Sequence, residues 1–228
     1  MLRLSIIMPV LNEGEAIAAA LDALSDLRGL GVEVIVVDGG SSDATVQRAR
    51  LRADHVLKTP RGRALQMNAG AEKATGDVLL FLHSDTRLPT AAELLVLGGL
   101  ERSGCAWGRF DVTIAGRHPL LATVSRMMNL RSRATGIATG DQAIFVKREV
   151  FVAAGGFPAI PLMEDIALCK RLKRVGRPLC LRERVVTSGR RWERHGVLRT
   201  IVLMWRLRLS YFFGADPALL ARRYGYGE

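Results

Sequence analysis

The sequence contains few cysteines, and their arrangement suits neither a metal site nor a disulfide framework. Cys105, Cys169 and Cys180 are odd in number, lie far apart and form no Cys-x-x-Cys pair. Structural zinc sites and small disulfide-linked domains depend on closely paired cysteines. The pattern therefore excludes both classes and favours a protein of the reducing cytosol.

Long uninterrupted apolar runs are also missing. The amino-terminal run is broken by Pro9 and Glu13 and is too short for a signal peptide with its cleavage site. A second apolar segment, residues 197–214, carries Arg206 and Arg208 at its centre, which argues against a membrane-spanning helix. We therefore expect residues 4–10 to form the first strand of a cytoplasmic protein.

Neither of the common phosphate-binding loops is present. The segment VDGGSSDAT, residues 37–45, places glycines after a predicted strand but matches neither G-x-G-x-x-G nor G-K-S/T. The sequence thus gives no support to an NAD enzyme or an ATPase. A divalent ion held by few carboxylates is the usual alternative for neutralising phosphate, and Asp85 is placed to supply a ligand.

Charge of one sign dominates, with 33 Lys and Arg against 22 Asp and Glu and a net charge of +11. The arginine clusters lie mostly after residue 170. This asymmetry suggests an anionic partner, whether nucleotide phosphate, anionic lipid or nucleic acid. A solvated basic surface would give the same pattern.

Strand and helix signals alternate along the first hundred residues. The apolar runs predict strands at 4–10, 32–38, 54–59 and 77–83. The segments between them predict helices at 15–27, 41–53 and 63–74. This succession predicts an α/β fold with a mostly parallel central sheet flanked by helices and right-handed crossovers. Looser signals follow, with helices near 90–102, 119–132 and after Glu164 and an extended segment at 107–114. We expect the second half to elaborate the same sheet.

The domain organisation follows from size. A chain of 228 residues with 49% hydrophobic content can bury one sizeable core. We expect a catalytic domain over residues 1–190 and a C-terminal amphipathic helical extension over residues 191–228.

Polar groups follow each of the four predicted strands. They are Asn12-Glu13, Asp38, Arg61 with Arg63, and His83 to Asp85. The carboxyl ends of parallel strands share one edge of the sheet, where open α/β sheets bind their ligands. Any one of these groups could be a helix cap or a turn residue. Four of them together predict a binding site.

Five segments resemble the inverting glycosyltransferase family 2, which has the GT-A fold. They span residues 4 to about 176 and read SIIMPVLNE, VIVVDGGSSDAT, GRALQMNAGAEKATGDVLLFLHSDTRLP, TGDQAIFVKREVFVAAGGFP and MEDIALCKRLKRVG. Their order and spacing agree with the family. Within it the chain is most similar to a small soluble bacterial branch in which the D-x-D motif is replaced by H-A-D or H-S-D.

The resemblance implies a nucleotide-sugar donor and a divalent metal ion, Mn²⁺ or Mg²⁺, with Asp85 as the direct metal ligand. His83 departs from the D-x-D pattern: it would contact the ribose together with Ser84, or ligate the ion. Asp38 would hydrogen-bond the base, which we expect to be uracil before guanine, although Gly39 stands where many members have a second acid. The nucleotide pocket would also include Pro9, Leu11, Glu13 and Arg63.

The same resemblance implies that Asp165 is the general base and that Glu164, beside it, lies over the sugar site. Acids at the start of a helix are also favoured by the helix dipole alone. Further sugar or acceptor contacts would come from Asp141 and Gln142 in TGDQ and from Arg191 and Trp192 in SGRRWERHG, a shortened relative of the Q-x-x-R-W motif. Trp192 could equally pack in the core, and His195 is a candidate metal ligand.

Residues 197–214 form an amphipathic segment with Arg199, Arg206 and Ser210 on one stripe. Three roles stay open: packing on the catalytic domain, a homodimer seam, or peripheral contact with the inner face of the membrane. Packing within the protein or a dimer is the default, and a lipid-linked acceptor would favour the third.

The resemblance therefore implies a metal-dependent, inverting hexosyltransferase with no nucleic-acid partner. A sugar nucleotidyltransferase should carry a Gly-rich, Lys-containing loop after the first strand, which PVLNEGEA lacks. A non-catalytic basic protein bound to membrane or nucleic acid would not need Asp38, Asp85 and Asp165 on one edge.

Overall fold

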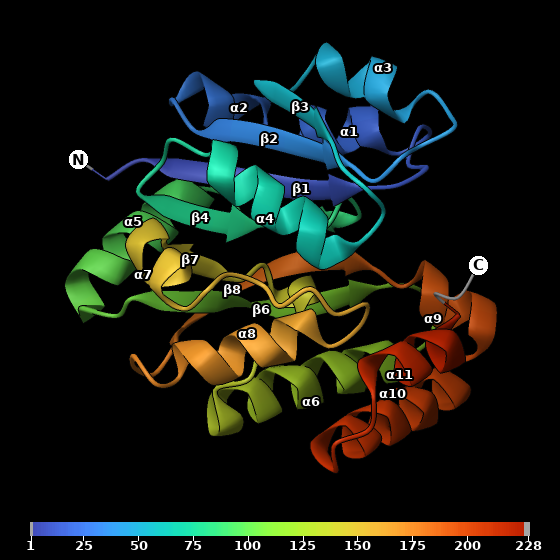
Figure 1. Ribbon diagram of the computed structural model, residues 1–228. Coiled ribbons are helices and arrows are strands. Elements are labelled where there is room, and N and C mark those ends of the chain that lie inside the picture. The colour runs from blue at the N-terminus through green and yellow to red at the C-terminus, as the bar shows by residue number, and fades with distance from the viewer. Residues whose placement is uncertain (1, 226–228) are drawn as a thin grey trace.

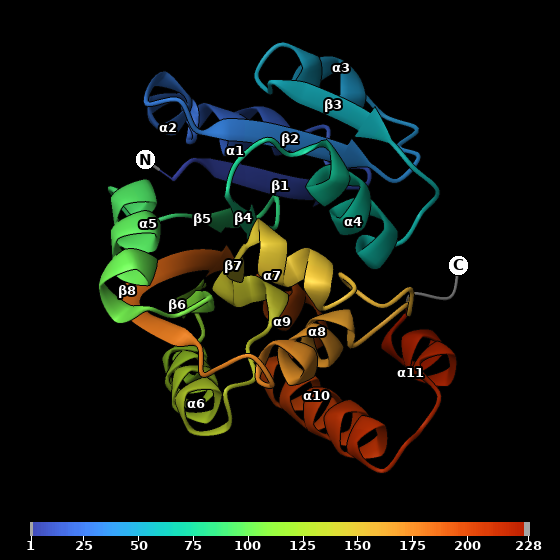
Figure 2. The same cartoon turned by 60° about the vertical axis from the view of Figure 1, so that its left-hand side comes forward.

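The computed structural model describes residues 2–225, which form an eight-stranded sheet with the strand order β3-β2-β1-β4-β7-β6-β8-β5 (Figure 1). Four of the seven strand pairs in this part of the chain are parallel, which confirms the predicted mostly parallel sheet. Helices cover both faces of the sheet, as Figures 1 and 2 show from two directions.

The first half is built of βα units, as predicted. Its strands are β1 (Leu4–Val10), β2 (Glu33–Asp38), β3 (His55–Lys58) and β4 (Val78–Phe81), and its helices are α1 (Ile17–Asp22), α2 (Ser25–Gly29), α3 (Thr45–Arg50) and α4 (Arg63–Lys73). The single helix expected at 15–27 is two short helices. A turn at Ala23 and Leu24 separates them and brings Leu24 into the core.

The second half adds antiparallel pairs to the same sheet. Its elements are β5 (Thr86–Arg87), α5 (Ala92–Ser103), β6 (Trp107–Ala115), α6 (Leu120–Thr135), the short 3₁₀ helix η1 (Gly140–Gln142), β7 (Phe145–Lys147), α7 (Arg148–Ala153), α8 (Glu164–Leu172) and β8 (Leu179–Ser188). Strand β7 runs antiparallel to β4 and to β6, whereas β6 and β8 are parallel. The expected elaboration of one sheet is thus confirmed.

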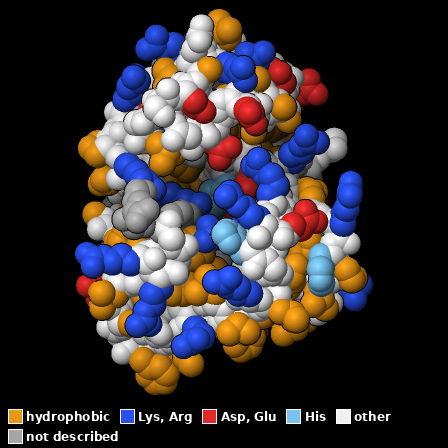
Figure 3. Space-filling model, turned by 90° about the vertical axis from the view of Figure 1, so that its right-hand side faces the viewer, with side chains coloured by type: hydrophobic (Ala, Val, Ile, Leu, Met, Phe, Trp, Pro, Cys, Tyr) orange, Lys and Arg blue, Asp and Glu red, His pale blue; other side chains and the backbone are white. Residues whose placement is uncertain are grey.

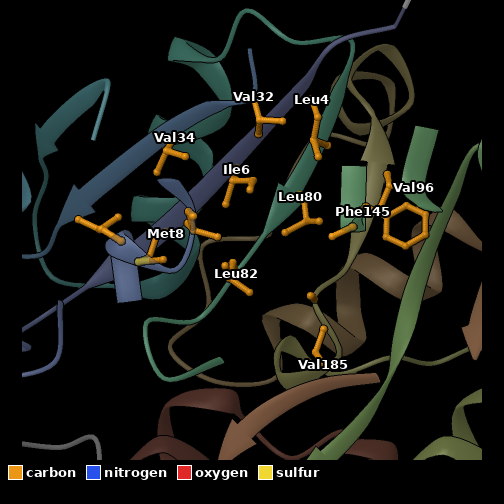
Figure 4. Packing of buried hydrophobic residues seen from close by; sticks show 14 of the residues in the cluster. Leu4, Ile6, Met8, Val32, Val34, Leu80, Leu82, Val96, Phe145 and Val185 are labelled. Atoms are coloured by element: carbon orange, nitrogen blue, oxygen red, sulfur yellow. The ribbon is translucent and has the colours of Figure 1, made fainter. Parts of the chain in front are cut away.

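The core lies in two layers, one on each face of the sheet. Alternate residues of β1 point to opposite faces: Ile6 and Met8 join one cluster (Figure 4), and Ile7 joins the other. Helix α5 covers the first layer through Val96, and α4 covers the second through Met67. Burial on both faces explains why the first strands are apolar throughout.

A buried ionic cluster lies between β6 and α6. The Arg109 side chain is fully buried and donates to Asp111 and, over 3.3 Å, to the Asn129 carbonyl oxygen. Arg133 donates to the other Asp111 oxygen at 2.7 Å from a half-exposed position. Asp111 therefore neutralises two guanidinium groups at once.

Three helices end the described chain: α9 (Arg190–His195), α10 (Val197–Phe212) and α11 (Pro217–Tyr224). One face of α10 packs on α8 and α11, where Leu207 meets Ile166 and Leu220. No helix within residues 2–225 combines the length and the apolar character that a membrane crossing requires. The division between residues 1–190 and 191–228 stays a prediction.

Candidate active site

A cavity of about 1720 Å³ opens at the carboxyl edge of the parallel strands. Figure 3 looks onto this edge and shows a hollow ringed by Lys and Arg side chains, with acidic side chains on one side and hydrophobic ones below. The predicted site residues that line the cavity include Pro9, Leu11, Glu13, Arg63, His83, Ser84, Asp85, Asp141, Glu164, Asp165, Arg191 and Trp192. Asp38 and Gln142 do not line it.

The end of β1 places Glu13 beside the end of β4. Burial raises the pKa of Glu13; the positive charge of Arg190 opposes that rise, the negative charge of Asp85 adds to it, and a side-chain hydrogen bond with Ser84 lowers the pKa. The backbone N–H of Glu13 donates to Thr45 Oγ1 at 2.8 Å, which fixes the loop after β1. One end of the cavity thus brings together Glu13, Ser84, Asp85 and Arg190. The sequence analysis did not predict Arg190 as a site residue, because nothing but its place in an arginine cluster pointed to it.

Asp38 is fully buried behind the loop after β2. Its Oδ2 accepts hydrogen bonds from the backbone N–H groups of Gly40 at 3.1 Å and Ser41 at 3.0 Å. The structure therefore shows Asp38 shaping the loop at the cavity edge, and its contact with a base stays a prediction. Gln142 is likewise buried, with its amide within 3.5 Å of the Phe110 carbonyl oxygen.

Gln66 is a cavity residue that the sequence reasoning missed. From the buried face of α4 its Nε2 donates to the carbonyl oxygens of Val10 and Val37, each at 2.8 Å. It therefore ties the carboxyl ends of β1 and β2 together. The available signal was a polar residue one turn after Arg63 on a helix face that is otherwise apolar.

Asp85 and Glu13 are the carboxylates that could hold a metal ion. Within residues 2–225 no three His, Cys, Asp or Glu side chains cluster as a metal site. Mg²⁺ and Mn²⁺ in phosphate-binding sites commonly take one or two carboxylates and complete their shell with substrate oxygens and water. The residues fit an ion of that kind and do not fit one held by the protein alone.

The His83 ring connects β4 with η1. Its Nδ1 lies 3.2 Å from Asp141 Oδ1, and its Nε2 side packs against Gly140, where an added Cβ would overlap with the imidazole. Burial opposes ionisation of Asp141, but the hydrogen bond and charge of His83 and the charges of Arg63 and Arg191 prevail and lower its pKa. The absence of a side chain at Gly140 is therefore what seats the imidazole.

If His83 contacts a nucleotide sugar, as the resemblance implies, Gly140→Ala should weaken nucleotide-sugar binding by about tenfold, because overpacking of about 1–3 kcal/mol would push His83 away from Asp141. Calorimetric titration with nucleotide sugar measures the affinity. Gly29→Ala is the control, since nothing lies within 4 Å of a Cβ added at Gly29. Equal affinity in both variants would show that the His83 position does not matter for the donor.

The acid pair begins α8 from a strained backbone. Met163, the residue before the pair, is a buried non-glycine residue with φ of +69°. Asp165 accepts hydrogen bonds from the backbone N–H groups of Gly140, at 3.0 Å to Oδ2, and Ile166, at 2.7 Å to Oδ1. Burial and the charge of Asp165 raise the pKa of Glu164 to about 7, with Arg63 opposing, and burial likewise raises the pKa of Asp165.

The far wall of the cavity comes from the C-terminal helices. Arg191 stacks on the Tyr224 ring at 3.7 Å and donates to the Tyr224 carbonyl oxygen at 2.9 Å. Trp192 lines the cavity and also packs with the cluster of Leu121 and Val197, so its packing role is confirmed and its contact with a sugar stays a prediction. His195 lines the cavity from an exposed position.

The comparisons with known proteins agree with this geometry. The model of the Glycosyl transferase family 2 matches residues 5–145. The undecaprenyl-phosphate 4-deoxy-4-formamido-L-arabinose transferase of Yersinia pestis is 31% identical over 162 residues, which are 64% of this chain and 48% of that protein. The chain spans less than half the length of the curated relatives it matches.

Two solved structures share the fold. The mannosyltransferase PcManGT from Pyrobaculum calidifontis, in complex with GDP-Man and Mn²⁺, aligns with a TM-score of 0.66 at 23% identity over 99% of this chain and 69% of its own. S. aureus TarS 1-349 in complex with UDP aligns with a TM-score of 0.67 at 18% identity over 82% of this chain and 60% of its own. These likenesses confirm the GT-A fold, and the family match, which covers most of the strands around the cavity, shows that the chain belongs to glycosyl transferase family 2.

Proposed function

We propose that the protein transfers a sugar from a nucleoside diphosphate to an acceptor hydroxyl, with inversion and with the help of a divalent metal ion. One observation carries the proposal: a single cavity holds both Asp85, just after β4, and the Glu164–Asp165 pair at the start of α8. In a metal-assisted in-line transfer, one carboxylate can hold the ion on the diphosphate and another can act as general base.

The donor would bind at the end of the cavity formed by β1, β4 and α4. Pro9, Leu11 and Glu13 would line the nucleotide, with Asp38 and Arg63 near the base. The structures of similar fold hold UDP in one case and GDP-Man with Mn²⁺ in the other, which supports a nucleotide-sugar donor. We propose UDP before GDP, and the test below includes both.

The metal ion would be held by Asp85, with Glu13 beside it. When bound, Mn²⁺ or Mg²⁺ would stabilise the charge that develops on the leaving diphosphate. Arg190 and Arg191 line the same cavity and would add hydrogen bonds to that diphosphate. His83, seated by Gly140, would contact the ribose.

Asp165 would take the proton from the acceptor hydroxyl. The two backbone N–H groups that it accepts from hold its carboxylate in one orientation. Burial raises the pKa of Asp165 above the ordinary value of a carboxyl, which makes its carboxylate a stronger base. Glu164, buried beneath, would be a neighbour that tunes this carboxylate.

The proposal also covers the sugar class, the acceptor and the place of the reaction in the cell. We propose hexosyl transfer at the cytoplasmic face of the membrane, onto an acceptor that is lipid-linked. The Yersinia pestis relative is named for undecaprenyl phosphate, which supports such an acceptor. A homodimer through residues 197–214 is the competing use of that segment.

A thermal-shift screen tests the donor and the metal together. At one common concentration, UDP and its sugars should raise the melting temperature more than GDP and its sugars do. At about 100 times its dissociation constant the preferred ligand should stabilise the protein by ~2.7 kcal/mol, or roughly 5–10 °C, and should need Mn²⁺ to do so. Asp85→Asn should keep the melting temperature without ligand and lose the Mn²⁺-dependent increment. Asp26→Asn, at an exposed position of α2, is the matched control. An unchanged increment in Asp85→Asn would refute the metal role.

A further inference from the structure

The cavity is larger than its donor end requires. Its volume of about 1720 Å³ exceeds the ~300–1,000 Å³ of common small-molecule sites. The remaining space is lined by α6 and α10, which lie at the same end of the molecule in Figures 1 and 2. A second ligand, beyond the donor, is therefore the natural occupant of this part.

The space between these helices is an apolar groove. Its walls include Val124, Met127 and Met128 of α6 and Met204, Trp205 and Phe212 of α10; we call this the α6–α10 groove. Met127 and Met128 lie three and four residues after Val124, and Phe212 lies seven residues after Trp205, which places these residues along one side of each helix. Met127 is 53% exposed, Trp205 70% and Phe212 74%, so the outer part of the groove offers large apolar surfaces to a ligand.

Two arginines interrupt this apolar lining. Arg131 and Arg208 line the same cavity, and Arg131 Nε and Nη2 and Arg208 Nε are buried without an acceptor anywhere in residues 2–225. Buried donors of charged groups are costly to leave unpaired. Burial lowers the pKa of Arg131, and the charge of Asp165 opposes that shift, so Arg131 lies on the acceptor side of the site.

We propose that the α6–α10 groove binds the acceptor, an anionic amphiphile that also carries the hydroxyl to be glycosylated, with its hydrocarbon chain on the apolar walls and its phosphate accepting hydrogen bonds from Arg131 and Arg208. A phosphate has enough oxygens to serve both guanidinium groups. A peptide fits less well, because its backbone would need several polar partners. The role of this ligand as acceptor rests on the proposed function, whereas its binding in the groove does not.

Alkyl phosphates below their micellar concentration test the groove by calorimetry. From n-butyl to n-decyl phosphate the affinity should rise by about 100-fold or more, since each buried methylene adds to binding. Inorganic phosphate and n-decanol, each with half of the recognised chemistry, should bind far more weakly than n-decyl phosphate. Vesicles containing phosphatidylglycerol form a separate arm that detects binding to a lipid surface.

Substitutions distinguish recognition of the ligand's phosphate from recognition of its hydrocarbon chain. Arg131→Met and Arg208→Met should each lower the affinity for n-decyl phosphate by ~10–100-fold and leave that for n-decanol unchanged. Trp205→Ser should reduce the increase in affinity between n-butyl phosphate and n-decyl phosphate. Arg126→Met and Val202→Ser are the matched controls, because these residues lie on α6 and α10 but do not line the cavity. Equal melting temperatures verify that each variant is folded.

The affinity for UDP with Mn²⁺, measured in the same proteins, separates this inference from the proposed function. Normal UDP binding without any dependence on chain length would overturn the groove and leave the donor site intact. Vesicle binding without binding of monomeric n-decyl phosphate would also overturn it, in favour of a surface contact. Chain-length dependence without binding of UDP, GDP or their sugars would keep the groove and refute the transferase.

Discussion

Asp165→Asn should lower the rate of sugar transfer by about 10²- to 10⁴-fold and leave donor affinity unchanged, because the base acts on the acceptor. Gly140 and Ile166 each donate a backbone N–H to this carboxylate. The amide nitrogen of the variant would face one of these donors. The melting temperature must therefore be compared before the rate loss is assigned to proton transfer.

Glu164→Gln is the matched control for this prediction. Burial and the charge of Asp165 raise the pKa of Glu164 to about 7, so its protonated form is well populated near neutral pH. Glutamine offers the same hydrogen-bonding groups as a protonated glutamate, and we expect a much smaller loss. Single-turnover rates at saturating donor measure both variants. The larger loss in Glu164→Gln would mean that the roles of the pair are reversed.

Asp111→Ala should destabilise the fold by about 3–5 kcal/mol, since it leaves the fully buried Arg109 guanidinium without its counter-charge. For a domain of this size the melting temperature should fall by roughly 6–20 °C. Urea unfolding monitored by circular dichroism gives the free energy directly.

Two comparisons make this second prediction specific. Arg133→Gln removes only the half-exposed partner of Asp111 and should cost ~1 kcal/mol or less. The double variant Arg109→Met with Asp111→Leu removes both buried charges and should recover most of the lost stability. If Asp111→Ala costs no more than Arg133→Gln, the buried pair contributes nothing beyond a surface contact.

The first four strands could be predicted because their signal is strong and local. Strands buried on both faces are apolar throughout, as Ile6 and Ile7 show by facing opposite layers. Parallel strands also end at one edge, so the convergence of Glu13, Asp85 and Arg63 on one cavity followed from topology alone. The roles of these residues came from the resemblance and not from the pattern.

Strand β8 escaped prediction because its middle residues, Arg182 to Arg184, are charged and exposed. It is held by pairing with β6, a tertiary contact that the sequence of β8 does not reveal. The sequence also could not show that Asp38 and Gln142 do not line the cavity. Whether a polar side chain at a strand end faces the cavity or its own loop depends on backbone turns that composition does not specify.

The left-handed backbone at Met163 gives the C-terminal helices a further task. A non-glycine residue in this conformation costs about 1–3 kcal/mol and persists only where its surroundings enforce it. The Met163 side chain is buried in a cluster with Leu207 of α10 and Leu220 of α11. These helices therefore hold the turn at Met163, which fixes the orientation of Glu164 and Asp165 at the start of α8. Exchanging these helices for a different module would release that turn, so in the proposed mechanism a change in the helices that bind the acceptor would also change the alignment of the base.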